Sequence, residues 1–311
     1  MCYSAKIWAD YLTYVRRYDA HIDVEAFVAL FYARLDNNRI KIPKALERSF
    51  EISTSAELAP LRQSIADFKA AQATQLEQEL FQLRNRQADA QRRLQTRITK
   101  AAQEDVRIAT RKLQTTLGRL ADLQRSTLNE SDARIYPGSY APVLILRDGQ
   151  RTIVPMRYQC RPAGKPASFD TQFPGTYNAR RDNLDGFWRN LFGTNHALLV
   201  IDAFFEHVSR RDGTGTKNVI LEFQPHPPAP MAVACLWSRW QAPGQDDLVS
   251  FAAITGAPPP EVAAAGHDRC IIPIAPEHID AWLCPERAPR TDLYALLDAR
   301  ERFIYENRLV A

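Results

Sequence analysis

The sequence predicts an α+β fold, in which a β-rich domain of mixed or antiparallel strands carries a long helical insertion of coiled-coil character. After residue 132, short runs of β-forming residues alternate with turns that contain proline or glycine. Residues 61–128 contain no proline and one glycine, and their apolar residues recur at three- and four-residue steps. Residues 5–35 also carry apolar and aromatic side chains at helical spacing. These three observations define the fold class.

Each element follows from its local pattern. Residues 5–35 predict two helices, separated near Asp19–Asp23. Residues 61–128 predict either a helical hairpin or one helix that would run on the order of 100 Å. Strands are expected at Pro142–Leu146, Thr152–Met156, Ala197–Ile201, Asn218–Phe223, Ala232–Leu236, Phe251–Ile254 and Cys270–Ile274. Shorter helices are expected at Leu184–Leu191, Pro259–Ala265 and Glu277–Leu283, and a final amphipathic helix at Thr291–Val310.

The change in composition along the chain divides it into two parts. Residues 1–50 and 134–311 are expected to form one domain, and residues 55–133 are expected to form a helical insertion within it. The 311 residues carry a net charge of +4, which is compatible with nucleic-acid binding but does not demand it.

The cysteines and the hydropathy pattern indicate the compartment. Five scattered cysteines show no paired spacing, so we expect reduced thiols, no disulfide framework and no zinc or other metal site. The start of the chain has no signal-like segment, and no apolar run reaches eighteen residues. We therefore expect a cytoplasmic protein that needs no cofactor and does not enter a membrane.

The insertion contains a basic segment between Arg84 and Lys112. A solvated helix face is the simpler interpretation. The alternative is an arm that contacts nucleic-acid phosphates, and residues 61–128 could also bind a helical partner or a second copy of the chain. The basic residues are Arg84, Arg86, Arg92, Arg93, Arg97, Lys100, Arg107, Arg111 and Lys112, and the acidic residues are Asp89, Glu104 and Asp105.

The chain starts with Met1-Cys2, and removal of Met1 would give Cys2 a free α-amine beside its thiol. Aminopeptidases remove methionine when the next side chain is small, as cysteine is. The α-amine titrates near ~8, so part of it is a neutral nucleophile at cellular pH. An amine and a thiol on one residue can close an aldehyde into a five-membered thiazolidine, which an internal cysteine cannot do.

Three later segments hold polar residues that a core does not need: Asn178-Ala179-Arg180-Arg181 after a Pro-Gly turn, Glu206 after two phenylalanines, and His267-Asp268-Arg269 before a strand. An asparagine can orient a substrate, an arginine can bind a phosphate, and a desolvated glutamate or a histidine can move protons. Each segment also has a structural interpretation, namely a turn residue, a strand-end ion pair and a helix cap.

The order of these segments resembles the SOS response-associated peptidase (SRAP) family. Members of that family start Met-Cys-Gly-Arg and carry N-A-R-x-E, G-[FW]-[FY]-E-W and H-x-R segments in this order. Here the segments are Met1-Cys2, Asn178–Arg180, Phe204–Glu206 and His267–Arg269. Residues 231–237 and 250–255 are similar to two further strands of the family. The resemblance covers residues 1–10 and about 134–285.

The resemblance implies that the protein recognises abasic sites in single-stranded DNA and crosslinks to them through a thiazolidine on processed Cys2. It implies that Asn178 orients the amine or the opened sugar, and that Glu206 moves protons during Met1 removal and ring closure. His267 would protonate the sugar oxygen. Met1 would be removed autocatalytically or by an aminopeptidase, a lyase activity could accompany the crosslink, and DNA binding would place the protein at the nucleoid. The implied DNA contacts are Arg180, Arg181 and Arg269.

The sequence also departs from the family pattern. Tyr3-Ser4 replaces Gly-Arg, which removes an arginine, and His207 stands where tryptophan is usual. Two other functions therefore stay open. One is an autoprocessing thiol peptidase, and the other is an inert SRAP-like scaffold that acts as a coiled-coil interaction protein.

Overall fold

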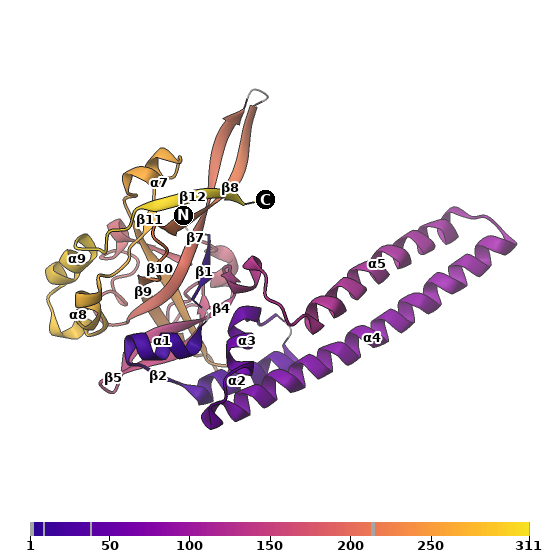
Figure 1. The fold of residues 1–311 in the computed structure, drawn as a ribbon, viewed down its shortest axis with the longest axis horizontal. Helices are drawn as coiled ribbons and strands as arrows, with labels where there is room; N and C mark the ends of the chain where they lie inside the picture. The colour runs from indigo at the N-terminus through magenta and orange to yellow at the C-terminus, as the bar shows by residue number, and fades with distance from the viewer. Residues whose placement is uncertain (1–2, 9, 38, 213–214, 311) are drawn as a thin grey trace.

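The fold is an α+β domain from which a helical hairpin projects (Figure 1). It is seen in a computed structural model, which describes residues 3–8, 10–37, 39–212 and 215–310. The predicted fold class is therefore confirmed. The division into two domains stays a prediction. Within the described ranges, no helix combines the length and the apolar character that a membrane span requires.

Twelve strands of the described residues form one mixed sheet. Five strands enclose a barrel-like core, because their pairings form a closed ring. These pairings are β4–β5, β5–β10, β10–β9, β9–β7 and β7–β4. The strands are β1 (Ser4–Ile7), β2 (His21–Ile22), β3 (Arg134–Ile135), β4 (Tyr140–Arg147), β5 (Gln150–Tyr158), β6 (Asn178–Arg180), β7 (His196–Asp212), β8 (Gly215–Pro225), β9 (Met231–Trp240), β10 (Leu248–Gly256), β11 (Cys270–Ile271) and β12 (Tyr305–Val310).

Three helices follow β1, and aspartates cap the N-terminal ends of the first two. Asp10 accepts a hydrogen bond from the Thr13 amide at 3.1 Å, and Asp23 accepts one from the Ala26 amide at 2.9 Å. Such caps satisfy amides that have no partner within the helix, so they fix where each helix begins. The helices are α1 (Tyr11–Tyr18), α2 (Val24–Asp36) and then α3 (Lys44–Glu51).

The hairpin consists of α4 (Ala59–Thr96) and α5 (Lys100–Gln124). Beyond Phe68, the buried residues of the two helices follow alternating four- and three-residue steps, or whole seven-residue repeats, which is the spacing of a seam between two packed helices. On α4 these residues are Leu80, Leu83 and Ala90, and on α5 they are Ala102, Ala109, Leu113 and Thr116. Thr99 caps α5 by accepting a hydrogen bond from the Ala102 amide at 3.2 Å. We call α4 and α5 together the arm.

The remaining helices are short. They are α6 (Phe169–Gln172), α7 (Pro260–Ala264), α8 (Ile279–Leu283) and α9 (Arg290–Asp298), with 3-10 turns at Ala56–Leu58, Glu130–Ala133, Arg181–Asn183, Pro276–His278 and Pro285–Arg287. Two sequence predictions are wrong here. Leu184–Leu191 forms consecutive turns, and the predicted C-terminal helix ends at Asp298. The chain then forms β12, which pairs with β8 from Tyr305–Pro225 to Val310–Ile220, because β8 offers a free backbone edge.

Candidate active site

The described chain begins at Tyr3 and enters β1, which runs antiparallel to β7 with Ser4 opposite Phe205 and Ala5 opposite Phe204. The first strand therefore starts beside the F-F-E segment that sequence analysis singled out. The predicted nucleophile, Cys2, lies outside the described residues.

Glu206 and His267 meet although they are far apart in the sequence. The Nε2 atom of His267 lies 3.1 Å from Oε2 of Glu206, whose side chain is completely buried. Burial raises the pKa of Glu206 to about 8, because a carboxylate is costly away from water. Burial likewise lowers the pKa of His267. At neutral pH both shifts favour a protonated carboxyl group beside a neutral imidazole.

The second ring nitrogen of His267 determines how the pair shares its proton. Nδ1 lies 2.8 Å from the carbonyl oxygen of Arg269, and a carbonyl can only accept, so Nδ1 carries the hydrogen. In the neutral ring Nε2 is then an acceptor, and it lies 3.1 Å from the carboxyl of Glu206. The pair thus holds one proton that can be delivered to a substrate and recovered from it.

Asn178 reaches the same region through the sheet. It is buried and begins β6, which runs parallel to β10 with Asn178 beside Ala253. Further along β10, Thr255 is paired with Arg180 on β6 and with Ile271 on β11. β10 therefore aligns the Asn178 segment with the segment that carries His267.

An aromatic rim adjoins the start of the chain, and sequence reasoning did not find it. The ring of Tyr3 lies 5.9 Å from those of Tyr136 and Tyr177 and 5.6 Å from that of His207. Tyr3 is 40% exposed and Tyr136 38% exposed. Exposed rings of this kind are platforms on which unpaired bases stack. The four rings come from four separate segments of the chain, so no local sequence pattern predicts that they gather.

Arg134 was also missed. Its Nε and Nη2 atoms donate to the hydroxyl of Ser4 at 3.0 and 2.8 Å, and its guanidinium lies 3.7 Å from the ring centre of Phe205. The departure from Gly-Arg at residues 3 and 4 is thus accompanied by an arginine that arrives from β3. A single arginine in a short strand gives no signal of this position in the sequence.

Comparison with known families decides the relationship. The family described as SOS response associated peptidase (SRAP) matches residues 71–308. The protein is a member of the SRAP family. This membership associates it with DNA damage and the SOS response. The matched range includes Asn178, Glu206 and His267 and does not include Cys2.

Three solved structures resemble this SRAP protein. A Bordetella bronchiseptica protein is 20% identical, with 58% of this chain and 87% of that chain covered and a TM-score of 0.47. A Bacteroides thetaiotaomicron protein is 14% identical, with coverages of 61% and 82% and a TM-score of 0.49. A phage-related protein of Bordetella bronchiseptica is 18% identical, with coverages of 60% and 85% and a TM-score of 0.45. No curated protein matches the chain.

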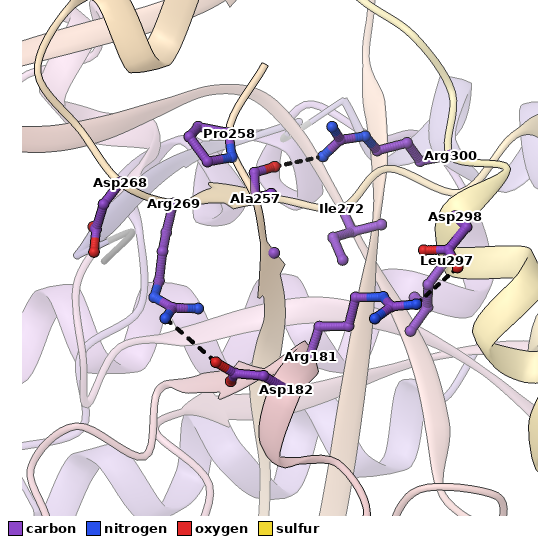
Figure 2. A pocket seen from close by; sticks show the side chains of 11 residues that line it. Arg181, Asp182, Ala257, Pro258, Asp268, Arg269, Ile272, Leu297, Asp298 and Arg300 are labelled. Atoms are coloured by element: carbon purple, nitrogen blue, oxygen red, sulfur yellow. Dashed lines mark hydrogen bonds and ion pairs between the residues drawn. The ribbon is translucent and has the colours of Figure 1, made fainter. Parts of the chain in front are cut away.

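The three arginines predicted to contact DNA occupy different settings in this SRAP protein. Arg180 forms a two-pronged ion pair with Asp182 at 3.0 and 2.6 Å, and Arg269 reaches the same carboxylate at 3.5 Å. Arg181 turns instead toward Asp298 at the end of α9, at 2.7 Å (Figure 2). Arg180 and Arg269 therefore form one group, and Arg181 lies across from it.

A pocket of about 480 Å³ lies between Arg269 and Arg181 (Figure 2). Arg181, Arg269 and Arg300 line it together with Asp182, Asp268 and Asp298, so its formal charges balance. Within the described part of the chain, no three His, Cys, Asp or Glu side chains gather closely enough to bind a metal ion.

The raised pKa of Glu206 predicts a pH-dependent stability. Its folded-state pKa of about 8 exceeds the ordinary value of 4.5, so between these values the folded state binds more protons than the unfolded state. The stability that Glu206 contributes is fully present below about pH 4.5 and is lost as the pH rises toward about 8. Urea unfolding at pH 5 and at pH 8 measures this loss. Between these pH values, the free energy of unfolding of wild type should fall by on the order of a few kcal/mol more than that of Glu206→Gln. Equal losses would contradict the assigned pKa.

Proposed function

We propose that this SRAP protein traps abasic sites in single-stranded DNA covalently, through a thiazolidine formed by Cys2 after Met1 is removed. The observation that supports this proposal best is the buried Glu206–His267 pair, with 3.1 Å between the carboxyl and the imidazole. Glu206 lies on β7, the strand that pairs with β1 where the described chain starts. Family membership supports a function in DNA damage more generally.

The reaction joins one aldehyde, one amine and one thiol and releases one water. The α-amine of Cys2 attacks the aldehyde carbon of the opened sugar, and a carbinolamine forms. Its hydroxyl leaves as water after it receives a proton, which gives an imine. The sulfur of Cys2 then adds to the imine carbon while the nitrogen takes a proton, and the five-membered ring closes. No oxidant or reductant is consumed.

Glu206 and His267 would supply the proton transfers in this sequence. The protonated carboxyl of Glu206 is the acid for water loss, and His267 accepts or returns the proton through Nε2. A buried acid whose pKa lies near the working pH suits this task, because it can both give and regain a proton. His267 would also protonate the sugar oxygen when the ring opens, and Asn178 would orient the amine or the opened sugar.

The DNA strand would approach over the aromatic rim and the group formed by Arg180 and Arg269. Both arginines already share the carboxylate of Asp182, which holds their guanidinium groups in place before DNA binds. About half of the Arg180 side chain is exposed, so a phosphate can reach it from solvent. Arg181 would contribute from the far side of the pocket.

The direct test mixes purified protein with single-stranded DNA that carries one abasic site, with the same strand lacking that site as control. A denaturing gel should show a slower band only with the abasic strand. If wild-type protein forms no such band although mass spectrometry shows that Met1 is absent, the DNA proposal is refuted. Repeated turnover of added peptides in that case would favour the thiol peptidase instead.

A further inference from the structure

The positive charge of this protein is concentrated in the distal arm, which we define as residues 84–112. Nine basic and three acidic residues give this segment a net charge of +6. The whole chain carries +4, so the remaining residues together carry −2. The mildly basic character of the protein therefore belongs to the arm and not to the domain that holds the candidate site.

The basic residues of the distal arm form ordered rows on the helix surfaces. Arg86 and Arg93 on α4 are seven residues apart, Arg97 directly follows the end of α4, and Lys100, Arg107 and Arg111 on α5 are seven and four residues apart. Residues at such intervals share one helix face, and seven residues advance about 10 Å. All six side chains are exposed, because the seam between the helices is built from other residues.

Only part of this charge is neutralised within the arm. Asp105 bridges Arg86 and Arg93 at 2.6 Å each, and Glu104 pairs with Arg107 at 2.6 Å. Among the described residues, Arg97, Lys100 and Arg111 have no ion-pair partner. No side-chain hydrogen bond or ion pair among the described residues ties these three cations to the packing of the hairpin.

The distal arm also lacks the apolar surface that a protein partner would require. Of the large apolar side chains exposed in the described residues, only Ile98 falls between residues 84 and 112. A stable protein–protein interface needs an apolar centre with few charges. Two copies of this segment would repel each other. Figure 1 shows the arm projecting away from the sheet, so its surface is open to a long partner.

We propose that the distal arm binds the phosphate backbone of DNA outside the candidate active site. This inference rests on the proposed function only in taking DNA as the partner, and its chemistry does not involve Cys2. A phosphate chain fits the rows of cations because it carries regularly spaced negative charges and requires no apolar contact. The arm would hold the protein on DNA regardless of sequence and of damage.

The test measures binding to intact DNA, which has no aldehyde. The arm variant is Arg97→Gln/Lys100→Gln/Arg111→Gln, which breaks no ion pair among the described residues. The matched control is Arg16→Gln/Arg39→Gln/Arg287→Gln, which removes three exposed cations from the domain. Fluorescence anisotropy on single strands and duplexes of about 30 nucleotides, over a range of salt concentrations, gives Kd and its salt dependence.

We expect the arm variant to bind about tenfold more weakly near 0.1 M salt, and its log–log salt slope on duplex DNA to flatten by about 2 to 3. The control triple should retain the wild-type slope. Arg97→Lys/Arg111→Lys should also bind like wild type, because the charge is kept. Comparing the two DNA forms shows whether the arm takes single strands, duplexes or both.

Three outcomes would overturn the inference: an arm variant that binds like wild type, a control that weakens equally, or a variant whose molar mass changes while its DNA affinity does not. The last would identify a self-association surface. Crosslinking to an abasic strand of about six nucleotides, which offers few phosphates beyond the candidate site, should be unchanged in the arm variant. Failure of wild type in that assay would refute the Cys2 proposal and leave the arm result standing.

Discussion

Replacing Cys2 with alanine should abolish the heat-stable adduct with abasic DNA. Alanine is small enough for Met1 removal, so the variant keeps the α-amine and loses only the sulfur. The amine can still form an imine, which hydrolyses when the protein is denatured, but without sulfur the ring cannot close. A denaturing gel should therefore show no shifted band, a loss of at least ~100-fold, since nucleophilic catalysis is removed entirely.

Two controls make the Cys2→Ala result specific. Cys284→Ala removes another thiol that is not fully buried and should leave the band intact. Adding borohydride to the Cys2→Ala reaction should restore a band, because reduction makes the imine permanent. A heat-stable adduct in Cys2→Ala without borohydride would show that another residue is the nucleophile.

Glu206→Gln should slow adduct formation by roughly 100-fold or more, which is the range for loss of a positioned acid. The amide keeps the shape of the carboxyl and can still donate to Nε2 of His267, but it cannot release a proton. The pH profile is the sharper readout. Wild type needs a neutral amine, which favours high pH, and a protonated Glu206, which is lost as pH rises through about 8. Its rate should peak near pH 8.

In Glu206→Gln the rate should no longer fall at high pH. The slow rate of this variant should instead rise to a plateau as the pH increases. Glu222→Gln is the matched control, because Glu222 is a buried glutamate on the neighbouring strand β8 that pairs with Arg308. That variant should be less stable but should form the adduct at the wild-type rate, with the same pH profile. A bell-shaped profile that persists in Glu206→Gln would remove Glu206 from the acid role.

The parts of the fold that depend on local pattern could be predicted from the sequence. The absence of proline and the regular apolar steps predicted the long helices, and Asp23 marks the break between α1 and α2. β12 could not be predicted, because its strand state depends on pairing with β8 some eighty residues earlier. Leu184–Leu191 has helical apolar spacing, yet Gly186 weakens a helix there and the segment forms turns.

The candidate site, like the fold, could be predicted from the sequence only in part. The segments that hold Asn178, Glu206 and His267 stood out because their polar residues border apolar runs, and their order resembled one family. Their mutual distances could not be inferred from spacing, since Glu206 lies on β7 and His267 lies in the loop between α7 and β11. Tyr136 and Arg134 carried no signal, because each becomes part of the site only through the pairing of β1 with β3 and β7.

The most direct test of the account is to identify the crosslinked residue. The adduct between wild-type protein and abasic single-stranded DNA should be digested with nuclease and protease and sequenced by mass spectrometry. We predict an N-terminal peptide that lacks Met1 and carries the sugar remnant on Cys2, with a mass that equals addition of the aldehyde and loss of one water. A remnant on a lysine or on another cysteine, or a modified peptide that retains Met1, would contradict the account.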